Sequence, residues 1–248
     1  MKIKFFGTGE AFDNNLANTS ILLLDKIKLL LDCGYNIPQK IWQYNDDPNF
    51  IDAIYISHAH ADHYFGLPAL ILRMIEDKRG KKLTIICQNR LKTKIISLLK
   101  LGYVSILKNN NIAIEFIELT GKETIKFKEY QLSFANTIHP QANLAIKISV
   151  NNIKICYSGD GKYSKRSEEL YRNSDLLIND AYMFKETNLN HSNITNLVTM
   201  VKKYQVRKIC LVHMFRNTRI NELEIIKKWL NKEKINAIIP KDGDIISI

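Results

Sequence analysis

The six residues from 58 to 63, His-Ala-His-Ala-Asp-His, carry the strongest chemical signal in the sequence. They directly follow AIYIS, an apolar run that predicts a buried strand. Residues two positions apart leave a strand on the same side, so His58 and His60 can converge on one metal ion. Asp62 and His63 open the helical stretch that follows, where they can face a second ion. Imidazole nitrogens with a carboxylate suit zinc first, and also manganese or iron.

A pair of metal ions needs more ligands than one short motif supplies, and other residues are placed to complete the set. His139 and His213 each close an apolar strand, and Asp160 follows another strand in the sequence Ser-Gly-Asp-Gly. His191 precedes a helical stretch. All six histidines of the chain therefore fall at the edges of predicted elements, which favours one shared site over isolated structural histidines.

Short apolar strands alternate with amphipathic helices along most of the chain, and these elements must position the site. Strands are expected at residues 2–6, 19–24, 27–32, 53–57, 83–87, 112–117, 124–127, 130–138, 144–150, 153–158, 175–180, 208–212 and 235–240. Helices are expected at residues 62–76, 89–100, 192–204 and 221–231. Asn151-Asn152 predicts a tight turn. The pattern indicates an α/β protein with two packed sheets and helices outside, in one domain spanning residues 1–248.

The composition excludes several classes of protein. Hydrophobic residues make up 46% and charged residues 25%, which is typical of a globular protein and excludes disordered and collagen-like chains. No apolar run approaches the roughly 20 residues that span a bilayer, and the N-terminus lacks a signal-like apolar core, so we expect a cytoplasmic protein without membrane contact. The four cysteines form no CxxC pair and are expected to be buried, reduced thiols.

The charge balance leaves two interpretations open. Lysine and arginine number 36 against 25 acidic residues, for a formal net charge of +11. A basic surface can concentrate anionic substrates such as nucleotides or RNA. The same excess can also reflect a composition that is rich in lysine, isoleucine and asparagine together.

The ordered set of motifs resembles the metallo-β-lactamase superfamily, from FFGTGEAF near the start to INAIIPKDGD near the end. SHAHADHYFGLPALI is especially similar to the branch that contains ribonuclease Z and related phosphodiesterases. The resemblance implies a four-layer αβ/βα sandwich with two divalent metal ions at one edge. It assigns His58, His60 and His139 to the first ion, Asp62, His63 and His213 to the second, and Asp160 to both.

The resemblance also implies catalytic roles. Two adjacent ions lower the pKa of a shared water, and the resulting metal-bridging hydroxide attacks, with Asp62 helping to move the proton. In the phosphodiesterase branch an acidic residue after a strand pairs with a histidine that begins a later helix, and Asp180 and His191 match this pattern. Such a histidine can stabilise charge that develops on the substrate. The additional candidate contacts for an anionic substrate are Lys162, Arg216 and Arg219.

The sequence also departs from ribonuclease Z. Many members carry a long tRNA-gripping arm between the third motif and the bridging aspartate, whereas here a short hairpin fills residues 140–159. The expected partner is therefore an anionic phosphodiester, small or RNA, with weak processing of pre-tRNA. Homodimers are common in this branch. Two alternatives stay open: a metal-dependent hydrolase of a lactone, ester or thioester, and a non-catalytic module that binds nucleic acid.

Overall fold

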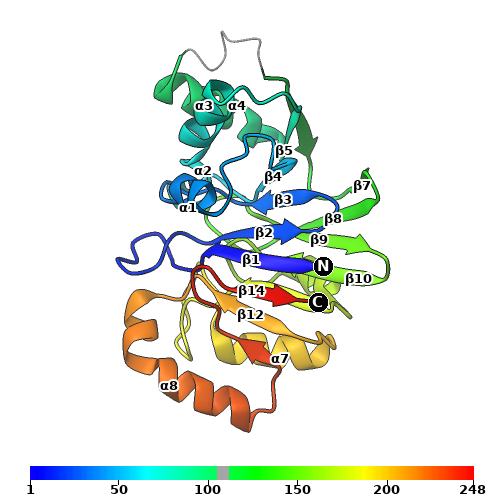
Figure 1. Cartoon of the computed structure of the whole chain (residues 1–248). Coiled ribbons are helices and arrows are strands. Elements are labelled where there is room, and N and C mark those ends of the chain that lie inside the picture. The colour runs from blue at the N-terminus through cyan, green and yellow to red at the C-terminus, as the bar shows by residue number, and fades with distance from the viewer. Residues whose placement is uncertain (105–111) are drawn as a thin grey trace. The chain divides into compact units, whose positions relative to one another are not determined.

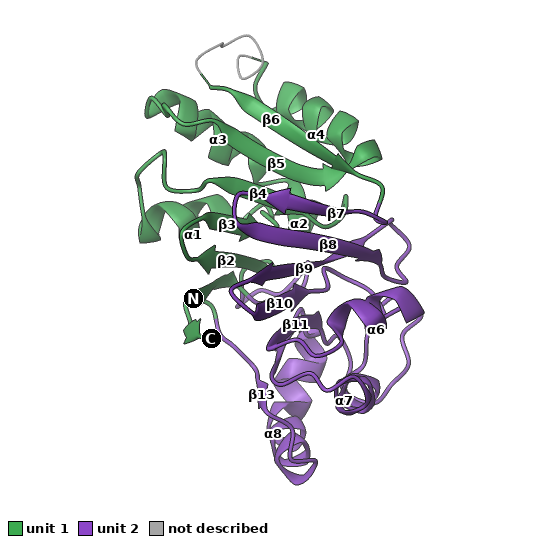
Figure 2. Cartoon of the chain, turned by 90° about the vertical axis from the view of Figure 1, so that its right-hand side faces the viewer, with its two compact units in different colours: residues 1–7, 17–120, 242–247 green, residues 8–16, 121–241, 248 purple. Residues whose placement is uncertain are grey.

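The computed structural model describes residues 1–104 and 112–248, which form two compact units (Figure 2). Unit 1 comprises residues 1–7, 17–120 and 242–247, and unit 2 comprises residues 8–16, 121–241 and 248. The expectation of a single domain over residues 1–248 stays a prediction. Within the described residues, no helix combines the length and the apolar character needed to cross a membrane.

Unit 1 is built on a seven-stranded sheet whose order is β14-β1-β2-β3-β4-β5-β6 (Figure 1). Neighbouring strands from β14 to β3 are antiparallel, and those from β3 to β6 are parallel. The strands are β1 (Lys2–Gly7), β2 (Ser20–Leu24), β3 (Lys28–Leu31), β4 (Ala53–Ile56), β5 (Leu83–Gln88), β6 (Ile114–Leu119) and β14 (Ile245–Ser247).

The helices of unit 1 cover the sheet through their apolar faces. They are α1 (Ile37–Tyr44), α2 (Ala61–Tyr64), α3 (Leu67–Glu76) and α4 (Asn89–Gly102). Leu70 of α3 and Ile95 of α4 lie in one buried cluster with Ile54 and Ile85 of the sheet. Burial of such side chains stabilises a fold by about 1.5–3 kcal/mol each, so this cluster keeps the strand ends in place.

Unit 2 is built on a second seven-stranded sheet, in the order β13-β12-β11-β10-β9-β8-β7. Neighbouring strands from β7 to β10 are antiparallel, and those from β10 to β13 are parallel. The strands are β7 (Thr124–Phe127), β8 (Tyr130–Asn136), β9 (Leu144–Val150), β10 (Ile153–Tyr157), β11 (Leu176–Asp180), β12 (Ile209–Val212) and β13 (Ala237–Ile238).

The helices of unit 2 are α6 (Lys165–Tyr171), α7 (Ile194–Lys203) and α8 (Arg216–Lys232). Leu197 of α7 and Ile226 of α8 share a buried cluster with Leu177 and Leu211 of the sheet. The α7 helix begins where the Asn193 side chain accepts a hydrogen bond from the backbone of Asn196, as an N-cap residue does. This cap fixes the segment that carries His191.

The predicted elements are mostly present, with differences that have local causes. The expected helix at 62–76 is wrong as one element, because the chain breaks between α2 and α3 at Phe65 and Gly66. Helices α1 and α6 and strand β14 were not predicted. They are short, and the apolar signal of such segments is weak. The turn at Asn151-Asn152 is confirmed: both residues have positive φ, as a type I′ turn requires.

Candidate functional site

In unit 1, His58, His60, Asp62 and His63 form what we call the N-terminal donor group. It follows β4, a parallel strand whose carboxyl end is the usual place for a ligand site in an α/β sheet. His58 and His63 are fully buried, and Asp62 is 5% exposed. The ring centroid of His58 lies 4.6 Å from that of His60 and 4.2 Å from that of His63. The motif thus packs its side chains tightly together.

Asp32 organises this group, although its place in the sequence did not predict such a role. It follows β3, is fully buried, and accepts hydrogen bonds from the backbone N–H and the hydroxyl of Ser57, both at 2.7 Å. Its Oδ2 also lies 2.8 Å from Nδ1 of His63. A carboxylate on Nδ1 fixes the tautomer of a histidine and presents Nε2 to a metal. The available signal was an aspartate that ends the apolar run LLLD, beside the strand that carries His58.

The loop that carries Asp32 also holds the helix of the motif. The backbone N–H of Cys33 donates to His63 O at 2.7 Å, and that of Gly66 donates to Cys33 O at 3.0 Å. Gly34 permits this approach, because a Cβ there would run into the carbonyl oxygen of Asp62. Burial, aided by the charge of Asp32, raises the pKa of the Cys33 thiol, which therefore stays protonated at neutral pH. All four cysteines are buried thiols, as expected.

In unit 2, His139, Asp160 and His213 form the C-terminal donor group. Each follows a strand, β8, β10 or β12, and these strands run in the same direction, so their carboxyl ends meet at one edge of the sheet. Asp160 is 2% and His213 3% exposed. Nε2 of His213 lies 3.5 Å from Oδ2 of Asp160. Two distant parts of the sequence thus deliver ligand atoms to one place.

Several contacts set the backbone of this group. Thr137 Oγ1 donates to Asp160 O at 2.7 Å, and the amide of Asn143 donates to the same oxygen at 2.8 Å. Gly161 has φ of +98°, and a Cβ there would lie 2.6 Å from the carbonyl oxygen of Ile138. His213 also has positive φ, 56°, which is unfavourable for a residue with a Cβ and is typical of functional positions.

The predicted pair of Asp180 and His191 is present beside this group. Asp180 is fully buried, and its Oδ2 lies 2.8 Å from Nδ1 of His191 and accepts from the backbone N–H of Gly161 at 2.9 Å. Asp180, His191 and His213 place ligand-type atoms within 4.8 Å of one another. The pair therefore shares the sheet edge of the C-terminal donor group.

The two partly exposed histidines of unit 2 have opposite pKa shifts. Burial lowers the pKa of His139, so its ring is neutral at neutral pH, as a metal ligand must be. Burial also acts to lower the pKa of His191, but the charge and hydrogen bond of Asp180 outweigh it and raise the pKa overall. Neighbouring groups with separated pKa values are typical of acid–base assignments in active sites.

Lys162 and His191 line the same cavity of unit 2, which has a volume of about 140 Å³. Its other lining residues are Ile138, Tyr163, Thr187, Asn188, Ser192, Asn193 and Asn196. The other candidate anion contacts are already engaged: Arg216 pairs with the buried Glu10 at 2.6 Å, and Arg219 with Asp13 at 2.7 Å. Lys162 is therefore the stronger candidate for contact with a substrate anion.

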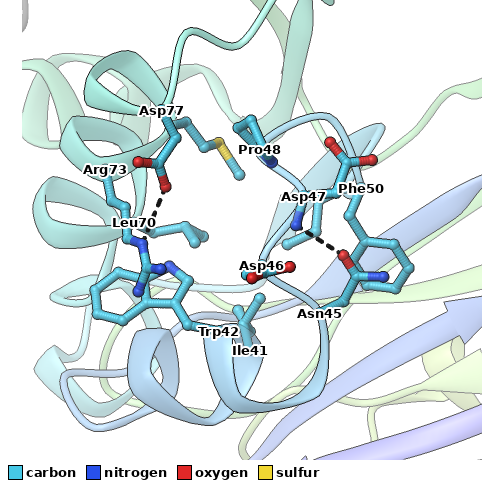
Figure 3. A pocket seen from close by; sticks show the side chains of 12 residues that line it. Ile41, Trp42, Asn45, Asp46, Asp47, Pro48, Phe50, Leu70, Arg73 and Asp77 are labelled. Atoms are coloured by element: carbon cyan, nitrogen blue, oxygen red, sulfur yellow. Dashed lines mark hydrogen bonds and ion pairs between the residues drawn. The ribbon is translucent and has the colours of Figure 1, made fainter.

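A separate cavity in unit 1 is much smaller, about 20 Å³, and lies between α1, residues 45–51 and α3 (Figure 3). Arg73, which lines it, faces the ring of Trp42 at 4.6 Å and pairs with Asp77 at 3.1 Å. The space is enough for about one water molecule. We assign no ligand to it.

Asp32→Asn is expected to weaken metal binding by about 10–100-fold, the usual cost of losing a residue that orients a ligand. Asparagine has only one accepting oxygen, so it cannot accept hydrogen bonds from Nδ1 of His63 and from both donors of Ser57 as the carboxylate does. Competition with a chromogenic chelator measures the change, and Asp77→Asn, an exposed site in the same unit, is the control. Equal affinity for Asp32→Asn and the unaltered chain would show that Asp32 does not orient a ligand.

The chain is similar to known proteins in both sequence and fold. A ribonuclease Z from Pyrococcus horikoshii is 27% identical over the whole chain and 96% of its own length. The solved metallo-β-lactamase-fold protein YhfI from Bacillus subtilis aligns over 99% of this chain and 98% of its own, with a TM-score of 0.84 and 20% identity. The short form of human tRNase Z aligns over 100% and 99%, with a TM-score of 0.80 and 19% identity.

These similarities confirm the metallo-β-lactamase fold and the resemblance to ribonuclease Z that the motifs predicted. A more specific match comes from a protein-family model that covers residues 1–230 and is described as anti-Pycsar protein Apyc1. Since that model matches nearly the entire sequence, from β1 into α8, the chain belongs to the Apyc1 family of anti-Pycsar proteins.

Proposed function

We propose that the chain is a phosphodiesterase that uses two divalent metal ions, and that it shares the anti-Pycsar role by which its family is described. The ribonuclease Z relatives support the class of reaction. The observation that carries the proposal for this chain is the buried Asp180 carboxylate bound to His191, beside Asp160 and His213. A histidine held in this way is suited to an anionic, oxygen-rich substrate.

The donor atoms fit metal ions. In three of the histidines Nδ1 faces an oxygen atom. These pairs are His58 with Ser57 at 3.0 Å, His63 with Asp32 at 2.8 Å and His139 with Asn190 at 2.9 Å. Each Nε2 therefore points away from that oxygen and can bind a metal ion. Nε2 of His63 lies 3.1 Å from Oδ2 of Asp62. Two ligands of one tetrahedral zinc, each about 2.0–2.2 Å from the ion, are separated by a similar distance.

On this basis we propose the following ligands. His58, His60 and His139 bind one ion, Asp62, His63 and His213 bind the other, and Asp160 binds both. Zinc is the first choice for this set, with manganese or iron as alternatives. When bound, such ions activate water near neutral pH and offset the charge of a phosphodiester.

The remaining roles belong to side chains. Asp62 would help to move a proton from the attacking water. His191, whose pKa Asp180 raises, would donate a hydrogen bond to a non-bridging oxygen or to the leaving group. Lys162 lines the same cavity as His191 and would contact the substrate anion. The cavity favours a small substrate, and the β9–β10 hairpin leaves little chain between His139 and Asp160 to form an RNA-binding arm.

We expect measurable turnover of bis-p-nitrophenyl phosphate and of small cyclic phosphodiesters, and weaker 3′ processing of pre-tRNA. Binding energy from remote contacts supports turnover of large substrates, and the short hairpin between His139 and Asp160 offers little of it. The measurement is kcat/KM for all substrates at one salt concentration, because affinity for RNA depends strongly on salt. A p-nitrophenyl carboxylic ester is included, and each rate is divided by that of the uncatalysed reaction.

Two results of this substrate comparison would contradict the proposal. A larger rate enhancement on the carboxylic ester would overturn the proposal and favour the lactone, ester or thioester alternative. If pre-tRNA exceeds the small phosphodiesters by several orders of magnitude, the chemistry holds but the substrate assignment is wrong, and another basic surface grips the RNA.

A further inference from the structure

His191, which would act in the proposed reaction, lies in the connection between β11 and α7 rather than within either element. Asp180 ends β11, and residues 181–190 separate it from His191, which lies just before α7. Asp180 holds Nδ1 of His191 at 2.8 Å. One hydrogen bond fixes one atom of the ring, while the outer torsion of a histidine has a broad energy profile. A second contact is needed to set the plane of the imidazole.

Tyr182 supplies that contact. Its ring stacks on His191, with centroids 4.3 Å apart and planes 19° apart. Phe215 stacks on Tyr182 at 5.1 Å and 30°. The ring of His191 is also nearly parallel to that of His213, at 5.6 Å and 16°. The ring of Tyr182 also lies 6.1 Å from that of His213, so the rings of Tyr182, His191 and His213 pack against one another, with Phe215 on the ring of Tyr182.

The backbone of Tyr182 is held independently of its ring. Its carbonyl oxygen accepts from the backbone N–H of Phe215 at 2.9 Å. The next residue, Met183, forms an isolated bridge with Asn193 and accepts from the backbone N–H of Ile194 at 2.9 Å. Tyr182 is thus anchored to the segment after β12 and to the start of α7. Because these backbone contacts fix Tyr182, its ring can restrain the ring of His191.

We infer that Tyr182 is a positioning residue for His191: its ring fixes the plane of the imidazole that Asp180 holds at one end. The inference rests on the proposed function. Tyr182 need not touch the substrate, and the ring matters more than the hydroxyl, because stacking is a property of the ring. A displacement of about 1 Å in a positioned group can cost about 10²-fold in rate.

The test compares Tyr182→Leu with Tyr182→Phe on bis-p-nitrophenyl phosphate. We expect Tyr182→Leu to lower kcat by about 10–100-fold with little change in KM or bound metal, and Tyr182→Phe to retain most of kcat. Tyr204→Leu is the matched control, because Tyr204 is a buried tyrosine of unit 2 at the C-terminal end of α7, away from the ring of His191. It should lower the melting temperature but leave kcat unchanged well below that temperature.

A second readout does not depend on activity. In the metal-free protein, NMR of the histidine rings should show one set of shifted signals for His191, kept in Tyr182→Phe and averaged in Tyr182→Leu. If Tyr182→Leu keeps both kcat and these signals, the inference is wrong. If the unaltered chain does not cleave phosphodiesters at all, the proposed function fails instead, and the NMR comparison still decides whether Tyr182 sets the ring.

Discussion

Replacing Asp160 by alanine is expected to lower phosphodiesterase activity more than any other single change in the proposed ligand set. A carboxylate that binds both ions serves two sites at once, so its loss should exceed the roughly 10²–10³-fold that follows loss of one transition-state donor. Bound metal should fall below two ions per chain. Activity on bis-p-nitrophenyl phosphate and elemental analysis of the purified protein measure the two effects.

The surroundings of Asp160 make this change interpretable. Thr137 and Asn143 hold its backbone oxygen, and these bonds do not involve the carboxylate that alanine removes. Asp175→Asn, a change in the same unit that affects a pair with Arg207, is the control for loss of an acidic group. Two ions per chain and near-normal turnover in Asp160→Ala would contradict the bridging role.

The proposed ligand set stays a prediction, which rests on histidines and aspartates at the edges of predicted elements, in the order that the metallo-β-lactamase superfamily has them. The structure adds the physical reason for grouping His139, Asp160 and His213: they follow strands that run in the same direction, whose carboxyl ends meet at one edge of the sheet of unit 2. Asp180 and His191 could be paired because the resembling branch has an acidic residue and a histidine in the same order. The structure shows the hydrogen bond between them, whereas their catalytic roles stay predictions.

Residues that support the site could not be predicted in the same way. Asp32 acts through a pairing of β3 with β4, and a lone aspartate after an apolar run is ordinary. Tyr182 owes its place to Phe215, which follows a different strand and reaches it through a backbone hydrogen bond. Arg219 looked like an anion contact because its partner, Asp13, is 206 residues away. Contacts between residues so far apart in the sequence depend on the tertiary fold, which spacing does not encode.

His191→Ala is expected to lower the chemical step by about 10²–10³-fold, the usual cost of losing one donor to a transition state, while bound metal stays unchanged. Asp180 and Tyr182 hold the imidazole ring of His191. Removal of that ring should therefore leave the N-terminal and C-terminal donor groups in place. Single-turnover rates on bis-p-nitrophenyl phosphate and metal analysis are the measurements. Loss of metal in this variant would make His191 a ligand and overturn the proposed roles.

The pH dependence of activity separates a cationic donor from a neutral spacer. Asp180 raises the pKa of His191, so the ring is protonated below that raised pKa and loses its charge as the pH rises through it. Activity that needs the cation therefore falls on the alkaline side. In Asp180→Asn the charge that raises the pKa is gone, and the alkaline limb should move to lower pH, whereas in His191→Ala that limb should disappear. An unchanged alkaline limb in both variants would mean that another group sets it, and that His191 does not act as a charged donor.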